Sequence, residues 1–164
     1  MYTRWDDQRL YFAFVIKKKW FYNDGEFSGV WPYDCMHMSL YPGSLKKGQT
    51  AEFAPYRDHV AIDKHGKAII DRCQGPYPIP AGGYWPEGTQ LAIKQQPDGY
   101  IFELAYSRES VKPLKLAAGS AFRLGLGFLF SKPDKPGFAG IGWFYGIGNV
   151  DNAPDLHGEI KLVE

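Results

Sequence analysis

Short apolar segments separated by turn residues run along the whole chain, and no segment has the spacing of a long amphipathic helix. Residues 10–16 are rich in aromatic and β-branched side chains, which predicts a strand buried on both faces. In residues 35–40, apolar side chains alternate with small polar ones, which predicts a strand with one buried face. Further strands are predicted at residues 59–63, 90–95, 100–106, 122–130, 140–145 and 159–163.

Turn residues connect these strands over short distances. Residues 96–99, Gln-Pro-Asp-Gly, predict a hairpin, and the Pro/Gly-rich residues 75–88 predict a long loop. Only residues 108–116 invite a helical interpretation, which Pro113 limits to about one turn. This pattern predicts an all-β fold, a two-sheet antiparallel β-sandwich of immunoglobulin-like or jelly-roll-like type. Because no linker or repeat interrupts it, residues 1–164 are predicted to form a single domain.

The charge balance favours local recognition over long-range attraction. With 19 basic and 18 acidic side chains, the net charge of +1 creates no field that would draw the chain to nucleic acid or to an anionic membrane. Aromatic side chains make up 16% of the residues, which is more than a core of this size obviously requires. Some aromatic residues are therefore expected on the surface.

The two cysteines, Cys35 and Cys73, could form one disulfide in an exported protein or remain as two thiols in a cytosolic one. Their number does not distinguish these two redox states. No run of 18 apolar residues is present, and residues 1–7 lack the basic start and apolar core of a signal peptide. If the parent protein is secreted, its signal has been removed from this chain.

Four blocks of sequence stand in order along nearly the whole chain: Trp5-Asp-Asp-Gln-Arg-Leu-Tyr-Phe-Ala-Phe14, Trp31-Pro-Tyr-Asp-Cys-Met-His-Met-Ser-Leu40, Gly99-Tyr-Ile-Phe-Glu-Leu-Ala105, and Gly142-Trp143 followed by Asn152-Ala-Pro-Asp-Leu-His-Gly-Glu-Ile-Lys-Leu162. They resemble the blocks W-D-D-x-x-L-Y-V, W-x-x-D-S-V-E-I-F-I, G-Y-x-x-E-x-A and W…P-x-x-F-G-x-L-x-L of family 9 carbohydrate-binding modules. The resemblance implies a two-sheet sandwich that binds a plant or microbial glycan without catalysis. It also implies an extracellular location, attached to or associated with a glycan-degrading enzyme.

Three departures from the family pattern concern the sugar site and the sheet edge. Family members usually carry one or two further strands before the first block, so an edge of the sandwich is expected to be open. Their two tryptophans clamp a terminal sugar; Trp31 matches the first, while the second position falls at about Asp151. The glutamate that binds sugar hydroxyls is replaced by His37. Half of the clamp is absent, so the family's ligand specificity is not carried over.

The candidate ligand-binding residues combine aromatic faces with directional polar groups, because a sugar presents C–H patches for stacking and hydroxyls for hydrogen bonds. Trp31 supplies a stacking face, and His37 supplies a polar partner. Tyr84 and Trp85, set among glycines and prolines, are predicted to form an exposed platform. The same reasoning nominates the turn residues Asn149, Asp151 and Asn152 as polar contacts. Other tryptophans are assigned to the core (Trp5 and Trp143) or to a further exposed cluster (Trp20).

The sequence offers little support for a catalytic site or a metal site. The chain has no Gly-x-Ser-x-Gly, His-Glu-x-x-His, phosphate-loop or Cys-x-x-Cys motif, so no enzyme activity is predicted. No resident cofactor is predicted either. A metal site at His59 and His65, with Asp58 and Asp63 nearby, remains a hypothesis. A structural calcium ion bound by the loop carboxylates Asp24, Glu26 or Asp34 is a second hypothesis.

Two alternative functions remain open from the sequence. One is a haem-b domain, because sandwich relatives of this kind pair a methionine with a histidine or lysine. Its candidate ligands are Met36, Met38, His37 and His59. The other is an interaction module whose sandwich is completed by a strand from a partner protein.

Overall fold

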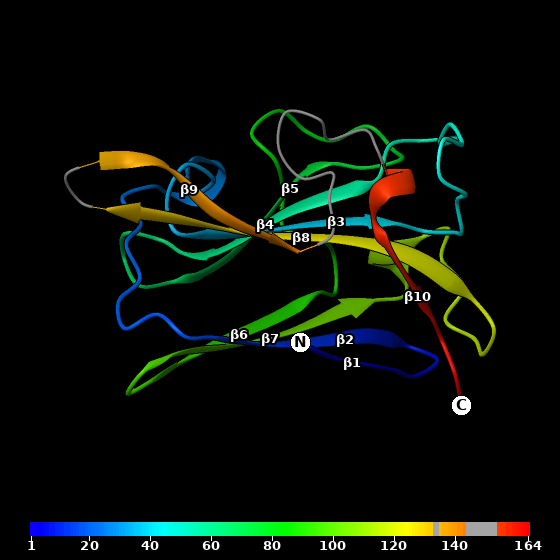
Figure 1. Ribbon diagram of the computed structural model, residues 1–164, viewed down its shortest axis with the longest axis horizontal. Helices are drawn as coiled ribbons and strands as arrows, with labels where there is room; N and C mark the ends of the chain where they lie inside the picture. The colour runs from blue at the N-terminus through cyan, green and yellow to red at the C-terminus, as the bar shows by residue number, and fades with distance from the viewer. Residues whose placement is uncertain (133–134, 144–153) are drawn as a thin grey trace.

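The computed structural model describes the backbone of residues 1–132, 135–143 and 154–164, and the side chains of residues 1–131 and 154–164. Two antiparallel sheets face each other as the layers of a sandwich (Figure 1). This confirms the predicted fold class. The smaller sheet has the strand order β1 (Tyr2–Trp5), β2 (Arg9–Ile16), β7 (Gly99–Ser107), β6 (Gln90–Gln96).

The larger sheet is organised around its longest strand, β8 (Ala121–Lys132). One side of β8 pairs with β3 (Cys35–Tyr41). β3 pairs in turn with β4 (Tyr56–Ile62), and β4 pairs with the edge strand β5 (Ala68–Gln74). The first residues of β8 also pair with β10 (Gly158–Lys161), and its later residues pair with β9 (Lys135–Trp143). The long strand thus holds three partners in one sheet.

Three single-turn 3₁₀ helices complete the described elements: η1 (Phe27–Gly29), η2 (Glu109–Val111) and η3 (Pro154–Leu156). The short turn expected near residues 108–116 is η2, which ends before Pro113. No helix in the described part of the chain is long and apolar enough to cross a membrane.

The strands agree with the sequence predictions in most places and differ in three. The hairpin at 96–99 is present, with Gln96 paired to Gly99. Two strands, β1 and β5, were not predicted. The prediction that residues 10–16 are buried on both faces is wrong, because burial alternates along β2 and Val15 is 54% exposed. The outer face of the smaller sheet is uncovered, so these strands bury only one side.

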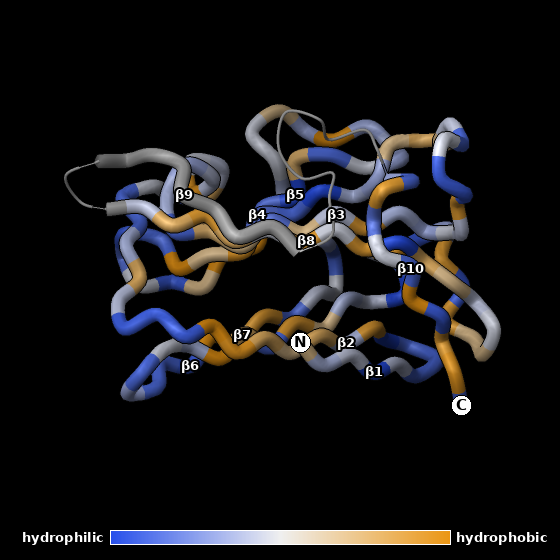
Figure 2. Tube along the Cα trace, in the orientation of Figure 1, coloured by the Kyte–Doolittle hydropathy of each residue, from blue (hydrophilic) through white to orange (hydrophobic). Residues whose placement is uncertain are grey.

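The core fills the space between the inner faces of the two sheets. Hydrophobic residues concentrate along β2 and β7 where these strands face the larger sheet (Figure 2). Phe12 meets Phe122 of the opposite sheet edge to face, with ring centroids 6.2 Å apart. Met36 and Met38 of β3 also project into this core, as the alternation in residues 35–40 predicts.

A buried ion pair interrupts the apolar core at the β4–β5 side. Arg72 is 1% exposed and forms two hydrogen bonds to Asp58, Nε to Oδ1 at 2.7 Å and a terminal nitrogen to Oδ2 at 2.8 Å. The guanidinium also donates to the Ser110 carbonyl and lies over the Tyr56 ring, 4.0 Å from its centroid. Tyr106 donates its hydroxyl proton to Asp58. Every charge of this network is therefore paired.

Candidate functional site

The outer face of the larger sheet carries a row of polar side chains across three strands. Strand register places His37 of β3 beside His59 of β4, and His59 beside Asp71 of β5. The two imidazole rings are in contact, with centroids 4.5 Å apart. His59 Nδ1 lies 3.4 Å from Asp71 Oδ2. Side chains of paired residues share one face of a sheet, so this row faces away from the core.

Trp31 lies at the end of this row, in the turn that leads into β3. Its indole is 45% exposed. Its carbonyl oxygen lies 3.3 Å from His37 Nε2, within hydrogen-bonding distance of the imidazole. The backbone of this turn therefore lies next to the His37 imidazole, and the role of both residues in ligand binding stays a prediction.

Asp34 anchors the Trp31 turn to its surroundings. This buried carboxylate accepts hydrogen bonds from the backbone N–H of Tyr22 at 2.6 Å and of Ser131 at 2.7 Å. It also pairs with the Lys18 ammonium. Ser131 belongs to β8, so the turn is fastened to the central strand of the sheet. This anchoring holds Trp31 at the sheet surface.

The two histidines have opposite pKa shifts. Burial, the neighbouring charge of His59 and the charge of Arg57 lower the pKa of His37 to about 4. Burial also opposes the charged form of His59, but hydrogen bonds to Asp71 and Cys73 and the charge of Asp71 outweigh it, raising the pKa of His59 to about 9. At neutral pH the face carries a neutral His37 beside a protonated His59.

These shifts predict that the free energy of unfolding is largest near pH 6.5. The folded-state pKa of His59 lies above its usual value of 6.5, so its contribution is fully present below pH 6.5 and is lost as the pH rises through about 9. The folded-state pKa of His37 lies below 6.5, so its contribution is present above pH 6.5 and is lost as the pH falls toward about 4. Each change is on the order of 3 kcal/mol.

Urea denaturation between pH 4.5 and 9.5 measures this profile. His37→Gln is expected to flatten the acid side and His59→Gln the alkaline side. A wild-type profile that coincides with both variants at every pH would contradict the assignment.

Tyr84 and Trp85 do not form the exposed platform that the sequence predicts. Tyr84 bridges to Arg72 through backbone hydrogen bonds of 2.9 and 3.3 Å, which extends the sheet beyond β5. Because paired residues share a face, Tyr84 lies on the Arg72 side of the sheet, away from Trp31. Trp85 is half-buried, packs against the core and donates its indole N–H to the Thr89 carbonyl at 2.9 Å.

The structure describes some of the other aromatic residues named from the sequence, and the nominated turn residues lie outside its described part. Trp5 is half-buried against the core, and its indole N–H donates to the Val163 carbonyl at 2.9 Å. Trp20 is 60% exposed. The remaining nominated residues lie outside the part of the chain whose side chains are described: Trp143, Asn149, Asp151 and Asn152.

The structure separates the residues of the histidine metal hypothesis. Asp58 points into the core toward Arg72, while His59 points outward, so the two do not share a site. His65 lies 3.2 Å from a Glu26 oxygen at the far end of β4. In the part of the chain with described side chains, no group of three or more His, Cys, Asp or Glu residues is placed to hold a metal ion.

Two of the three carboxylates named in the calcium hypothesis, Asp34 and Glu26, are engaged by other groups. Asp34 is engaged by Lys18 and by two backbone N–H groups. Glu26 pairs with Lys64, Nζ to Oε1 at 2.5 Å, and with His65. A calcium ion would have to displace these partners.

The haem alternative requires an inward methionine and an inward histidine or lysine. Met36 and Met38 point into the core, whereas His37 and His59 occupy the outer face. Alternation along β3 puts consecutive residues on opposite sides, so these four side chains do not form an axial pair.

The cysteines are both free thiols. Cys35 lies on β3 and Cys73 on β5, with β4 between them. Two strand spacings are about 10 Å, which exceeds the Cα separation of a disulfide. In this fold, therefore, Cys35 and Cys73 do not form a disulfide with each other.

Sequence reasoning missed three members of the outer face: Arg57, Asp71 and Cys73. Asp71 is buried, and the loop after β5 covers it closely. A Cβ atom on Gly83, which has φ +72°, would come within 1.7 Å of Asp71 Oδ1. The sequence signal that could have revealed them is a spacing of two residues, which places Arg57 with His59 on one face of β4 and Asp71 with Cys73 on one face of β5. It became informative only once the pairing of β4 with β5 was known.

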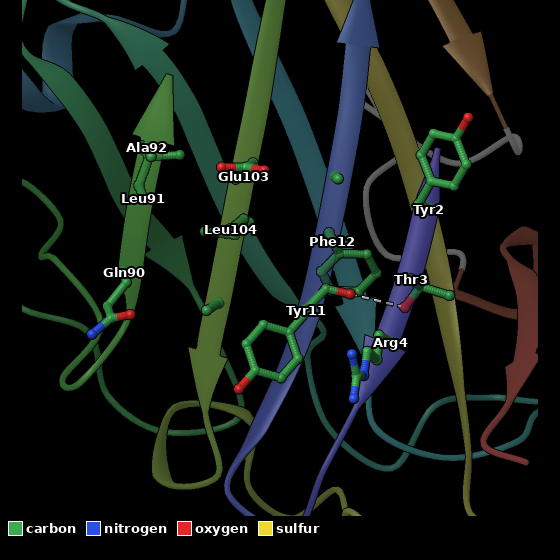
Figure 3. A pocket seen from close by; sticks show the side chains of 12 residues that line it. Tyr2, Thr3, Arg4, Tyr11, Phe12, Gln90, Leu91, Ala92, Glu103 and Leu104 are labelled. Atoms are coloured by element: carbon green, nitrogen blue, oxygen red, sulfur yellow. Dashed lines mark hydrogen bonds between the residues drawn. The ribbon is translucent and has the colours of Figure 1, made fainter. Parts of the chain in front are cut away.

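A concavity of about 420 Å³ lies on the outer face of the smaller sheet. Figure 3 shows Tyr2 and Tyr11 projecting from the neighbouring strands β1 and β2, with Arg4 beside Tyr11. Glu103 and Gln90 project from β7 and β6, the next strands of the same sheet. Tyr2 is 71% exposed. This groove belongs to the other sheet from Trp31 and therefore provides a reference surface for testing the Trp31 face.

Comparison with solved structures shows a likeness over almost the whole chain. A family 9 carbohydrate-binding module from Caldicellulosiruptor kristjanssonii, solved with cellotriose, aligns with a TM-score of 0.71 and 18% identity, covering 98% of this chain and 72% of that chain. The fold is that of a family 9 carbohydrate-binding module. A second family 9 structure from the same organism, solved with glucose, aligns over 97% of this chain and 73% of that one, with a TM-score of 0.63 and 18% identity. No protein-family model and no curated protein matches the sequence.

The family 9 fold accounts for the order of the four sequence blocks. The first block forms β2 and the turn before it, and the block that begins at Trp31 forms the turn and β3. The third block forms β7, at the centre of the smaller sheet. The final block contributes η3 and β10 against the start of β8. The resemblance stated from sequence is thus confirmed at the level of the fold.

Proposed function

We propose that this protein is a non-catalytic carbohydrate-binding module that recognises a plant or microbial polysaccharide or oligosaccharide by aromatic stacking. The glycan binds on the outer face of the larger sheet, with Trp31 as its platform. The module serves an extracellular glycan-degrading system, attached to or associated with the degrading enzyme.

The observation that carries this proposal is the placement of an exposed indole beside an ordered polar row. Trp31 is 45% exposed, and its turn is held by the buried carboxylate of Asp34. A stacking platform that is already held in place loses little conformational freedom on binding, which favours affinity. His37 of β3 lies within hydrogen-bonding distance of the backbone carbonyl of Trp31 in this turn.

The polar row suits a neutral, hydroxyl-rich ligand. His37 is neutral at pH 7, and if its Nε2–H donates to the Trp31 carbonyl, its Nδ1 can accept a hydrogen bond from a sugar hydroxyl. Arg57 lies on the same face, paired in register with Ser39. On the face that carries Trp31, an imidazole acceptor and a guanidinium donor can add directional contacts to the stacking that a pyranose needs.

The solved family 9 structures with cellotriose and glucose support a ligand built from glucose units. In this proposal the turn residues Asn149, Asp151 and Asn152 contribute further polar contacts, near the position of the family's second tryptophan. Because that position carries no tryptophan, we expect a site with one stacking face, which suits weaker binding than a two-sided clamp.

Trp31→Ala is expected to weaken glycan binding about 30-fold or more, because removing a central aromatic anchor typically costs at least about 2 kcal/mol. Affinity electrophoresis against soluble β-glucans and calorimetry with cello-oligosaccharides measure the loss. Tyr2→Ala is the matched control, since it removes an exposed aromatic from the groove on the other sheet. Retained binding by Trp31→Ala with lost binding by Tyr2→Ala would move the site to that groove, and no binding by the wild type would reject the function.

A further inference from the structure

Cys73 occupies the end of the polar row and contacts the histidine that the glycan proposal does not use. Its Sγ lies 3.8 Å from His59 Nε2 and 3.6 Å from the Arg57 carbonyl oxygen. The other ring nitrogen of His59, Nδ1, lies 3.4 Å from Asp71 Oδ2. Each nitrogen of the imidazole thus has a partner, with a sulfur on one side and a carboxylate on the other.

The three side chains differ in accessibility in a way that suits reaction at sulfur. Cys73 is exposed, whereas His59 is 7% and Asp71 1% exposed. Asp71 is held in place by the close approach of Gly83. Its Oδ2 faces His59, and its Oδ1 has no hydrogen-bond partner among the described residues. A buried carboxylate therefore fixes the ring, and the ring reaches the exposed thiol.

Positive charge lies next to the sulfur. The raised pKa of His59, about 9, keeps the ring protonated at neutral pH, so an imidazolium lies 3.8 Å from the Cys73 sulfur. The other groups facing the pair are His37 and Cys35 from β3 and Arg57 from β4. His37 is neutral above about pH 4, burial raises the pKa of the Cys35 thiol, and Arg57 adds a second positive charge.

We propose that Cys73 is a thiol-modification site, in which the His59–Asp71 pair lies against the exposed sulfur and assists its reaction with small disulfide compounds to form mixed disulfides. The arrangement follows the logic of an activated nucleophile, with a base next to the sulfur and a third group orienting the base. This inference is independent of glycan binding, because it uses neither Trp31 nor the stacking surface.

The reaction is a thiol–disulfide exchange. The Cys73 thiolate attacks one sulfur of the small disulfide, a new S–S bond forms to Cys73, and the original S–S bond breaks. The departing thiolate takes a proton from His59 or from water. The small disulfide is the only oxidant needed, because its second sulfur leaves as the reduced thiol.

The neutral probe 4,4′-dithiodipyridine tests this proposal, since release of its thiopyridone is followed by absorbance. At pH 6.5 the native protein is expected to react at Cys73 at least tenfold faster than the same chain unfolded in urea. Peptide mass analysis locates the adduct. Cys73→Ser should abolish the fast reaction, while Cys35→Ser should leave it unchanged because Cys35 is buried.

Two further variants separate activation from simple exposure. His59→Gln is expected to slow the reaction at least tenfold at pH 6.5 and to have little effect at pH 9, where thiols ionise without help. Asp71→Asn should cause a smaller loss with the same pH dependence, and it covers the case in which His59→Gln does not fold. Native and unfolded rates that agree at every pH, or an unchanged rate in both variants, would overturn the proposal. Glycan binding measured on the same samples reports separately on the proposed function.

Discussion

Replacing Arg72 by alanine is expected to lower the free energy of unfolding by about 3 to 5 kcal/mol, the largest stability effect of any substitution proposed for this protein. The guanidinium is buried and satisfies both oxygens of Asp58 and the Ser110 carbonyl. Its removal leaves a buried carboxylate without its counter-charge and opens a cavity beside Tyr56. Chemical denaturation of the wild type and the variant measures the loss.

A double-mutant cycle separates the ion pair from packing. Arg72→Met keeps much of the side-chain volume and removes the charge. Combined with Asp58→Leu, it should cost clearly less than the sum of the two single changes, because replacing both charges leaves no unpaired ion. Lys94→Ala, on the exposed face of β6, is the control and should change stability by less than about 0.5 kcal/mol. A loss below about 1 kcal/mol for Arg72→Ala would show that the network adds little.

Asp34→Ala is expected to destabilise the protein by about 3 kcal/mol and to weaken glycan binding at the proposed site as well. The carboxylate accepts hydrogen bonds from the backbone N–H groups of Tyr22 and Ser131 and pairs with the Lys18 ammonium. Its removal therefore leaves three donors without this acceptor. The turn carrying Trp31 is then no longer fastened to β8. Denaturation and calorimetry with a cello-oligosaccharide, at a temperature where the variant stays folded, measure the two effects.

The comparison of two substitutions at Asp34 sharpens this expectation. Asp34→Asn keeps an acceptor oxygen for one backbone N–H and should lose less of both stability and affinity than Asp34→Ala. Asp7→Ala, in the exposed turn before β2, should change neither by a measurable amount. If Asp34→Ala binds glycan as tightly as the wild type, the platform does not depend on this anchor.

Alternation within single strands was the part of this fold that the sequence could predict. In β3 the apolar residues Met36, Met38 and Leu40 face the core, and His37 faces outward, as their two-residue period indicates. The same rule failed for β2 because Tyr11, Ala13 and Val15 are apolar enough to look buried. Their face of the sheet is open to solvent, and nothing in the local sequence shows which face another layer covers.

Pairing between strands was the part that could not be predicted. Strand β5 was missed because Asp71 and Arg72 interrupt its apolar run, yet Arg72 points inward to Asp58 and Asp71 points outward to His59. Both partners lie on β4, and a register shift at Arg57 and Asp58 sets which residues meet. The polar row of the candidate site depends on this register, so its composition follows from long-range geometry.

The order of strand pairing has a consequence for how the protein is made on the ribosome. In each sheet the strands synthesised first pair with strands synthesised much later: β2 pairs with β7 and β3 with β8. Until β7 has emerged, the chain can form only pairs between strands adjacent in sequence, β1–β2, β3–β4 and β4–β5, and β3 must wait longer still for β8. Isolated pairs of this kind are marginal in water. The nascent chain therefore carries its core side chains unpaired through most of synthesis. Its yield in cells should depend on chaperones and on the rate of translation more strongly than its final stability would suggest.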